Sequence, residues 1–287
     1  MRSFHYVAIV LSLLLLVTGA MTAEPTKSST NGDINLIVRA DDIGFCHAAN
    51  AAIIDAYQNG IVQSTEIMAP CPWFMDAVRL LNENKGLDVG IHLTLNCEWA
   101  NYKWGPVTNA KTLVNKDGYF YSRASELNSG NVDLNELEAE LRAQIELVLK
   151  YVPHASHLSY HMDTALSKPE YKAIVEKLSR EFNLPMHPAN LTGSYEPWNV
   201  PVDEKEDFLV KKLNEFTPGN WMLIHHLALD VPETRALIGA NAVYDADIHM
   251  PEHRAMELKL MKSEKIKKII EERNIHLINY KDTFQGE

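Results

Sequence analysis

The sequence predicts an α/β protein, a single domain folded as a distorted, TIM-like (β/α) barrel. The first observation is a short apolar run at residues 34–40 that ends abruptly in Asp41, Asp42, Ile43 and Gly44, which is typical of a buried strand. The second is the alternation of strand and helix patterns along the chain that follows. The third is length, because residues 33–287 hold six or seven such βα units.

The elements expected in the first third of the chain alternate at short intervals. The two helices are an Ala-rich segment ended by Asn59-Gly60 and a segment that begins just after Pro72. The strands are short apolar or alternating runs. After the strand at 34–40, the expected elements are a helix over 48–58, a strand over 61–69, a helix over 73–84 and a strand over 87–93.

A long polar and aromatic segment, residues 96–130, then interrupts the alternation, and a loop of this length inside a domain is usually functional. The helical pattern resumes with a segment whose leucines lie on one stripe. The remaining expected elements are a helix over 133–152, a strand over 155–160, a helix over 169–182, a strand over 184–187, a helix over 204–216, a strand over 221–225, helices over 253–261 and 264–273, and a strand over 275–280.

Residues 1–23 predict a secretory signal peptide outside the fold. Arg2 gives a positively charged start, an apolar run follows over 7–17, and small residues over 18–20 offer a cleavage site. The run is too short for a membrane span, which needs about 20 apolar residues. We therefore expect an exported protein, periplasmic or extracellular, with no membrane attachment after cleavage; an uncleaved anchor is the alternative. Residues 24–32 predict a disordered lead-in to a domain over 33–287.

The composition limits the partners. The formal net charge is -11 and no cluster of lysine and arginine stands out, which argues against binding to nucleic acid or anionic membrane surfaces. The basic residues over 262–268 have helical spacing and fit a solvated helix face. The three cysteines, Cys46, Cys71 and Cys97, allow one disulfide at most and match no zinc-binding spacing.

Histidines occur at the ends of several expected strands, as the acidic pair Asp41-Asp42 does. A barrel brings the C-terminal ends of its strands together on one face, so we expect these side chains to converge. Two adjacent acids also favour a bound cation, which offsets their mutual repulsion. The histidines concerned are His92, His157, His161, His225 and His226.

One carboxylate and two imidazoles with open positions are suitable ligands for a catalytic divalent metal ion, of which Zn²⁺ fits well and Mg²⁺ is an alternative. Such an ion lowers the pKa of a bound water from about 15.7 to about 7. The second carboxylate of the pair would then serve as general base, and a histidine across the site would protonate a leaving nitrogen. This arrangement fits metal-assisted hydrolysis of an amide or ester.

Four motifs in this order resemble the YdjC-like carbohydrate deacetylases, and the resemblance spans nearly all of the chain after the signal peptide. The C-terminal segment around Arg254 and Glu257, and the closing run 275–280, are also similar. The motifs are Arg39-Ala40-Asp41-Asp42-Ile43-Gly44, the block over 60–65, Gly90-Ile91-His92-Leu93-Thr94-Leu95, and Ser156-His157-Leu158-Ser159-Tyr160-His161.

The resemblance implies a distorted (β/α) barrel that removes acetyl groups from N-acetylated sugars or oligosaccharides. Asp42, His92 and His161 would be the metal ligands, Asp41 the general base, and His225 the acid or transition-state stabiliser. We expect further residues to surround this centre. Those supporting it would be His157, Asp163 and Arg254, and those binding substrate would be Trp99, Trp104 and His226.

The expected role of Trp99 and Trp104 rests on the aromatic content of the segment 96–130, because aromatic rings stack on the apolar faces of sugars. These rings could equally cover one end of the barrel.

Two positions depart from the family pattern. The family usually has an Asp two residues before the third ligand, where this chain has Ser159. We hypothesise that Asp163 supplies the missing carboxylate. The family also typically reads His-Pro-Gly where this chain reads His225-His226-Leu227, so either histidine could face the site.

Two other functions remain open at this point. A glycoside hydrolase on the same barrel would need two carboxylates about 5 to 9.5 Å apart on opposite sides of a sugar, whereas Asp41 and Asp42 are adjacent. A non-catalytic sugar-binding protein would need the metal ligands but not the base.

Overall fold

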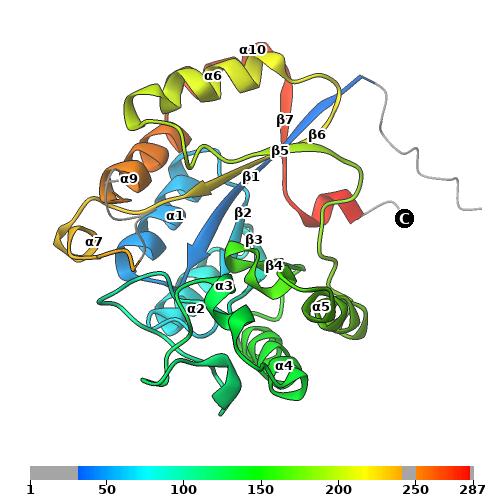
Figure 1. Cartoon of the computed structure of the whole chain (residues 1–287). Coiled ribbons are helices and arrows are strands. Elements are labelled where there is room, and N and C mark those ends of the chain that lie inside the picture. Colours follow the sequence, from blue (N-terminus) through cyan, green and yellow to red (C-terminus); the bar gives the residue numbers. More distant parts are fainter. Residues whose placement is uncertain (1–31, 241–249, 285–287) are drawn as a thin grey trace, which may run out of the picture.

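The computed structural model describes residues 32–240 and 250–284, and a parallel seven-stranded sheet forms the centre of this part of the protein (Figure 1). The strand order is β4-β3-β2-β1-β6-β5, and β7 pairs with β1 outside this path. Every ladder is parallel. The strands are β1 (Ile34–Ile43), β2 (Ser64–Ile67), β3 (Asp88–Leu93), β4 (His157–Tyr160), β5 (Leu191–Tyr195), β6 (Gly219–His226) and β7 (Ile275–Ile278).

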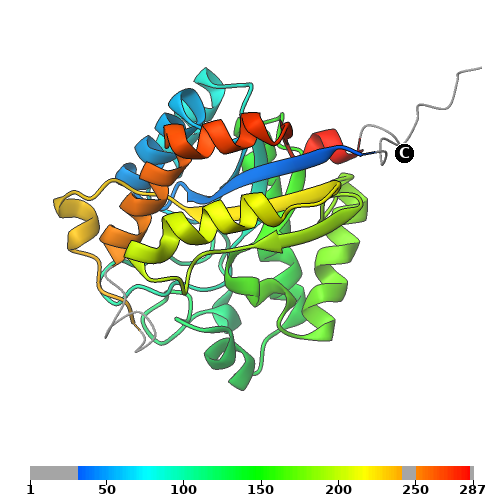
Figure 2. The same cartoon turned by 90° about the horizontal axis from the view of Figure 1, so that it is seen from above.

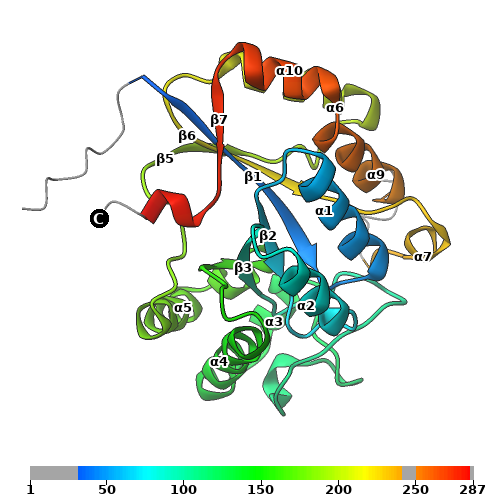
Figure 3. The same ribbon diagram turned by 180° about the vertical axis from the view of Figure 1, so that it is seen from behind.

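Helices surround the outer face of the curved sheet (Figures 2 and 3). The long ones are α1 (His47–Asn59), α2 (Phe74–Glu83), α4 (Leu134–Tyr151), α5 (Pro169–Phe182), α6 (Lys205–Glu215), α9 (Met250–Met261) and α10 (Glu264–Glu272). Helices α4 and α5 pack together beside β3 and β4, and α6 and α10 pack together on the other side. The result is the predicted distorted (β/α) barrel. Within the described ranges no ladder closes the barrel between β4 and β5.

Strand β1 determines what lies inside the barrel. Leu36, Val38 and Ala40 are buried in the main core beneath the helices, whereas Ile37 packs inside the barrel with Met222 and Tyr280. The alternation of a strand puts Arg39 and Asp41 on the same inner side as Ile37. Apolar packing therefore fills the inside near the N-terminal ends of the strands, and charged side chains follow toward the C-terminal ends.

One expected strand was wrong. Residues 184–187 form no strand, because Pro185 and Pro188 lack the N–H that a ladder requires. The backbone of this segment still reaches β4 through the hydrogen bond that Leu158 N donates to the carbonyl of Pro185 over 2.9 Å. The strand at this point of the barrel is β5, a little further along the chain, which pairs with β6.

The expected loop over 96–130 contains two short helices, η1 (Lys111–Leu113) and α3 (Ala124–Ser129). Two further short helices that the sequence did not predict are η2 (His161–Leu166), directly after β4, and α7 (Pro232–Arg235). Two more 3₁₀ turns are η3 (Val202–Glu204), just before α6, and η4 (Lys281–Phe284), after β7.

The predicted signal peptide, residues 1–23, and nearly all of the lead-in over 24–32 lie outside the described residues. In ranges 32–240 and 250–284, no helix has the length and apolarity to cross a bilayer. Cys46, Cys71 and Cys97 are free and buried. Cys46 precedes α1, and its Sγ accepts a hydrogen bond from Ala49 N at 3.4 Å.

Candidate metal centre

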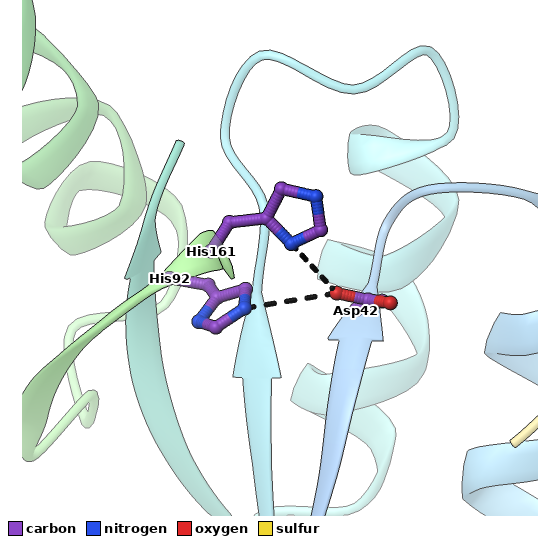
Figure 4. Close-up of side chains that lie close together, drawn as sticks. All are labelled: Asp42, His92 and His161. Carbon is purple, nitrogen blue, oxygen red and sulfur yellow. Dashed lines mark ion pairs between the residues drawn. The ribbon is translucent and has the colours of Figure 1, made fainter. Parts of the chain in front are cut away.

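Asp42, His92 and His161 converge at the C-terminal ends of three strands (Figure 4). They come from β1, from β3 and from the start of η2, just after β4. Asp42 Oδ1 lies 3.2 Å from His161 Nδ1 and 3.6 Å from His92 Nε2. All three residues are buried, and one potential ligand atom from each lies within 4.8 Å of the others.

The backbone at Asp42 lets two adjacent acids reach the same pocket. In a regular strand Asp41 and Asp42 would point to opposite faces. Asp42 instead has a φ of 73°, and the register of β1 against β2 shifts between Ala40 and Ile43. A positive φ is uncommon outside glycine but is tolerated by Asp, and such strained residues cluster at functional sites. The bulge therefore turns both carboxylates inward.

The donor set fits a divalent cation. Asp42 Oδ1 is buried and makes no well-aligned hydrogen bond within the described residues; its near polar neighbours are the ring nitrogens of His161 and His92. The second oxygen, Oδ2, accepts from Arg254 Nη2 at 2.9 Å. A cation between Oδ1 and the two imidazole nitrogens would satisfy this oxygen. One carboxylate and two imidazoles suit Zn²⁺ in particular.

Each imidazole uses its other nitrogen for a protein partner. His92 Nδ1 lies 2.7 Å from Ser159 Oγ, and His161 Nε2 lies 3.0 Å from Glu98 Oε2. Such partners fix ring orientation and select the nitrogen that faces a metal. The sequence did not reveal the role of Glu98, because it follows β3 in an irregular segment with no recognisable spacing.

The charges around the two imidazoles differ. Burial lowers the pKa of His92 to about 3, with the charge of His161 acting in the same direction. Burial also opposes protonation of His161, but the carboxylates of Glu98 and Asp42 outweigh it and raise the pKa of His161 to about 10. Despite its burial, the pKa of Asp42 is held well below its usual value by His161 and Arg254. In the metal-free protein His161 thus carries a positive charge between two carboxylates.

Asp41 lies beside this centre and is held by Arg39. Arg39 Nε and Nη2 donate to the two carboxylate oxygens of Asp41 over 2.7 and 2.8 Å. Burial raises the pKa of Asp41 to about 6, even though Arg39 acts in the opposite direction. A carboxylate with a pKa near neutrality can both accept and release a proton, as a general base must.

A pocket of about 220 Å³ opens over the centre. Most side chains around it are polar or charged. They are Arg39, Asp41, Asp42, His92, Glu98, Tyr160, His161, Met162, Asp163, Glu196, Trp198, Ile224, His226, Met250 and Arg254.

The histidine that faces the pocket is His226, and the expectation for His225 is corrected. His226 pairs in register with Asp41 and lines the pocket, with its Nδ1 3.5 Å from Glu196 Oε1. His225 pairs with Ala40, is buried on the other side of β6, and places its Nδ1 3.1 Å from Glu257 Oε2. Alternation along β6 allows only one of two adjacent histidines to point inward.

The aromatic residues also need correction. Trp99 and Trp104 are 1% and 3% exposed and belong to the core rather than to the pocket lining. Trp99 stacks on Phe45 with ring centroids 5.7 Å apart, and Trp104 Nε1 donates to the carbonyl of Asn96. These positions do not support stacking of Trp99 and Trp104 on a sugar. Trp198 lines the pocket instead.

The three residues expected to support the centre have different positions. Arg254 hydrogen-bonds Asp42 directly. His157 is fully buried and is bound away from the three ligand candidates, with its Nε2 2.7 Å from Glu66 Oε1 and its ring stacked on Tyr280. Asp163 lines the pocket but is exposed, because positive φ angles at Met162 and Asp163 turn it outward. The partner of His92 is therefore Ser159 and not Asp163.

Known proteins with similar sequences or folds were compared with this chain. A model of the YdjC-like protein family matches residues 35–272. A carbohydrate deacetylase from Clostridium beijerinckii is 28% identical over 256 residues, which cover 87% of this chain and 100% of the relative. Another, from Thermus thermophilus, is 30% identical over 227 residues, covering 70% of this chain and 80% of the relative. The crystal structure of a proposed cellobiose-phosphate cleavage protein from Enterococcus faecalis has a TM-score of 0.69 at 23% identity, covering 87% of this chain and 98% of the other, and shares the fold.

Proposed function

The chain belongs to the YdjC-like protein family, and from this premise we propose that it is a metal-dependent carbohydrate deacetylase that removes acetyl groups from N-acetylated sugars or oligosaccharides. The observation that carries the proposal is the convergence of one carboxylate oxygen of Asp42 with ring nitrogens of His92 and His161 in a buried position, with Asp41 beside them. Relatives named carbohydrate deacetylase that match most of the chain support the substrate class.

The ligands would be Asp42 Oδ1, His92 Nε2 and His161 Nδ1. Two imidazoles and one carboxylate favour Zn²⁺ over Mg²⁺, which prefers oxygen ligands. Held by these three residues, a divalent ion would supply Lewis-acid chemistry and would lower the pKa of water.

Asp41 is the proposed general base. Its carboxylate takes a proton from the attacking water as the water oxygen forms a bond to the carbonyl carbon. The two hydrogen bonds from Arg39 fix the plane of the carboxylate, so that it needs no reorientation during the reaction. Both acids are needed in this scheme, since Asp42 is occupied as a ligand.

His226 is the proposed general acid, in place of His225. It lies on the strand next to Asp41 and lines the same pocket. Its pKa is lowered by burial, so its charged form releases a proton readily. Transfer of that proton to the leaving nitrogen completes cleavage of the C–N bond, and the products are acetate and the free amine of the sugar.

Export is a separate proposal, which rests on the signal-peptide pattern of residues 1–23. Expression of the full chain in a bacterial host tests it. A mature N-terminus near residue 24 in the periplasm or medium supports export, and full-length protein retained with the cells contradicts it.

The central experiment is incubation of the purified protein with a panel of N-acetylated sugars and oligosaccharides. Free acetate and new reducing ends are both measured, with and without a chelator. Acetate release that stops with chelator and returns with Zn²⁺ supports the deacetylase. New reducing ends without acetate would identify a glycoside hydrolase, and neither product across the panel would contradict the proposed reaction.

A further inference from the structure

A buried chain of hydrogen bonds leads from His92 away from the pocket. His92 Nδ1 lies 2.7 Å from Ser159 Oγ, and the Ser159 hydroxyl donates to Glu66 Oε2. A hydroxyl carries one hydrogen, so while Ser159 donates to Glu66 its oxygen accepts from His92. His92 Nδ1 must then carry the hydrogen, which leaves Nε2, the nitrogen that faces Asp42, free to bind a cation.

Glu66 is held firmly at the far end of this chain. It is fully buried in β2, and its other oxygen, Oε1, lies 2.7 Å from His157 Nε2 and 3.8 Å from Arg39 Nε. These partners lower the pKa of Glu66 to about 2 in spite of its burial, so it is a charged acceptor. A charged acceptor makes a stronger hydrogen bond than a neutral one.

Strand β3, which lies between Glu66 on β2 and Ser159 on β4, leaves space for the hydrogen bond between these two side chains. Gly90 on β3 pairs in register with Glu66 on β2 and with His157 on β4. A Cβ at Gly90 would lie 2.0 Å from Glu66 Oε2 and 2.3 Å from His157 Nε2, both impossible contacts. Glycine therefore allows Glu66 to reach across β3 to β4, where Ser159 lies beside His92.

We propose that Glu66, acting through the hydroxyl of Ser159, is the positioning residue that sets the tautomer and orientation of His92 for metal binding. Histidine ligands usually donate their second N–H to a carboxylate, a carbonyl or water. Here the carboxylate lies one residue further away, and a serine hydroxyl connects it. This inference rests on the proposed metal site, so its test includes one measurement that needs no metal.

That measurement is the tautomer of His92 in the metal-free protein, read from the ¹⁵N shifts of its ring by NMR at neutral pH. The wild type is expected to show the Nδ1–H form alone. Ser159→Ala removes the acceptor and is expected to give a mixture of the two tautomers. An unchanged single Nδ1–H form in Ser159→Ala would overturn the proposal.

The second measurement is the affinity for Zn²⁺, determined by competition with a chromogenic chelator. Glu66→Gln keeps the shape of the side chain and removes its charge, and Ser159→Ala removes the link. Loss of an outer partner of this kind typically weakens metal affinity 10- to 100-fold, so we expect a loss of about that size in both variants. Affinity equal to wild type in both would overturn the proposal.

Restoring the Zn²⁺ affinity of Glu66→Gln with a second substitution distinguishes loss of His92 positioning from general damage to the core. Ser159→Asp in the Glu66→Gln background places a carboxylate next to His92 Nδ1, and we expect it to restore most of the lost affinity. The matched control is Glu140→Gln, which removes the charge of another fully buried carboxylate, in α4, bonded to the backbone of Val107 and Thr108. Its affinity for Zn²⁺ should equal that of wild type, whatever its stability.

The outcomes also distinguish this inference from the proposed function. If the wild type binds no Zn²⁺ but Ser159→Ala changes the tautomer of His92, the hydrogen-bond link stands and the metal-dependent mechanism fails. If the wild type binds Zn²⁺ and the double variant Glu66→Gln/Ser159→Asp stays as weak as Glu66→Gln, the positioning role of the carboxylate is overturned. Should Glu66→Gln fail to fold, Ser159→Ala and Ser159→Asp still provide both measurements.

Discussion

Asp41 and His226 are register partners on the neighbouring parallel strands β1 and β6, and both side chains line the same pocket. Partners across a parallel ladder share a face of the sheet, so an acid and an imidazole stand side by side at the mouth of the barrel. His225, one position earlier, faces the opposite way and pairs with Glu257.

The first prediction separates these two histidines. His226→Ala should lower kcat for acetate release by about 10²- to 10⁴-fold, the range for loss of a general acid. His225→Ala should mainly lower Tm, because it removes a buried partner of Glu257. Steady-state kinetics and thermal melting of both variants check this. A larger loss of kcat in His225→Ala than in His226→Ala would return the acid role to His225.

Asp41→Asn tests the general base. The amide keeps the shape of the side chain but cannot accept the proton, so kcat should fall by about 10²- to 10⁴-fold. Zn²⁺ affinity should change little, because the ligand set excludes Asp41. Rates and metal content are measured on the same preparation. A variant that binds metal and deacetylates at the wild-type rate would remove Asp41 from the mechanism, and a wild type equally inactive would favour a sugar-binding protein.

Arg39→Lys tests whether the two-point contact with Asp41 matters beyond its charge. Lysine keeps the positive charge but offers a single donor centre, so the Asp41 carboxylate can rotate. Misplacing a catalytic group by about 1 Å costs up to about 10²-fold in rate, and we expect a loss in kcat approaching that, with KM little changed. Arg79→Lys is the matched control, since Arg79 contacts Asp76 and Glu83 on the exposed side of α2. Equal kcat in the two variants would contradict the role of Arg39.

Metal removal should lower stability as well as activity. A ligand that binds only the folded state adds about 2.7 kcal/mol at 100 times its Kd, so Zn²⁺ should raise Tm and chelator should lower it. His161→Ala should abolish this shift in Tm. His47→Ala, which removes an exposed histidine paired with Asp76, should retain it. Differential scanning fluorimetry across a Zn²⁺ titration makes the comparison, and a full shift in His161→Ala would exclude His161 as a ligand.

The strands that carry the site could be predicted from sequence, because apolar runs and turn residues are local signals, whereas the strand expected over 184–187 was wrong. These signals predict that Asp41, Asp42 and the histidines at strand ends converge, and the resemblance to the YdjC-like family selects Asp42, His92 and His161 among them. The structure brings these three together. The choice between His225 and His226 could not be made in this way, since it depends on a one-residue register across β1 and β6. The positive φ of Asp42 could not be predicted for the same reason, because it accompanies a register shift between β1 and β2.

The burial of the tryptophans and the long-range partners of Glu66 could not be predicted from the sequence either. Trp99 and Trp104 belong to a polar segment rich in aromatic residues, a composition that is typical of sugar-binding loops. Packing against Phe45 nevertheless buries both rings in the core. Glu66 lies within an expected strand, and an acid in such a position could have suggested a buried partner. Its partners are nevertheless 91 and 93 residues away, at His157 and Ser159, and no local pattern names them.

The last prediction concerns stability at acid pH and rests on Glu257. This residue on α9 contacts the ammonium of Lys205 and the ring of His225, and all three are buried. Burial would raise the pKa of Glu257, but the hydrogen bond from His225 and the charge of Lys205 lower it to about 2. A carboxylate with a depressed pKa stabilises the fold above its unfolded pKa, near 4.5, and loses that contribution as the pH falls toward 2.

Wild type should therefore lose about 3 kcal/mol more than Glu257→Gln in free energy of unfolding between pH 5 and pH 2. At pH 7 Glu257→Gln should be less stable by about 3 to 5 kcal/mol, because it leaves the Lys205 charge buried without a counter-ion. Lys205→Met added to Glu257→Gln removes that charge and should recover part of the loss. Urea denaturation at pH 7, 5, 3 and 2 measures all three proteins, and parallel pH profiles for wild type and Glu257→Gln would show that the pair contributes nothing to acid sensitivity.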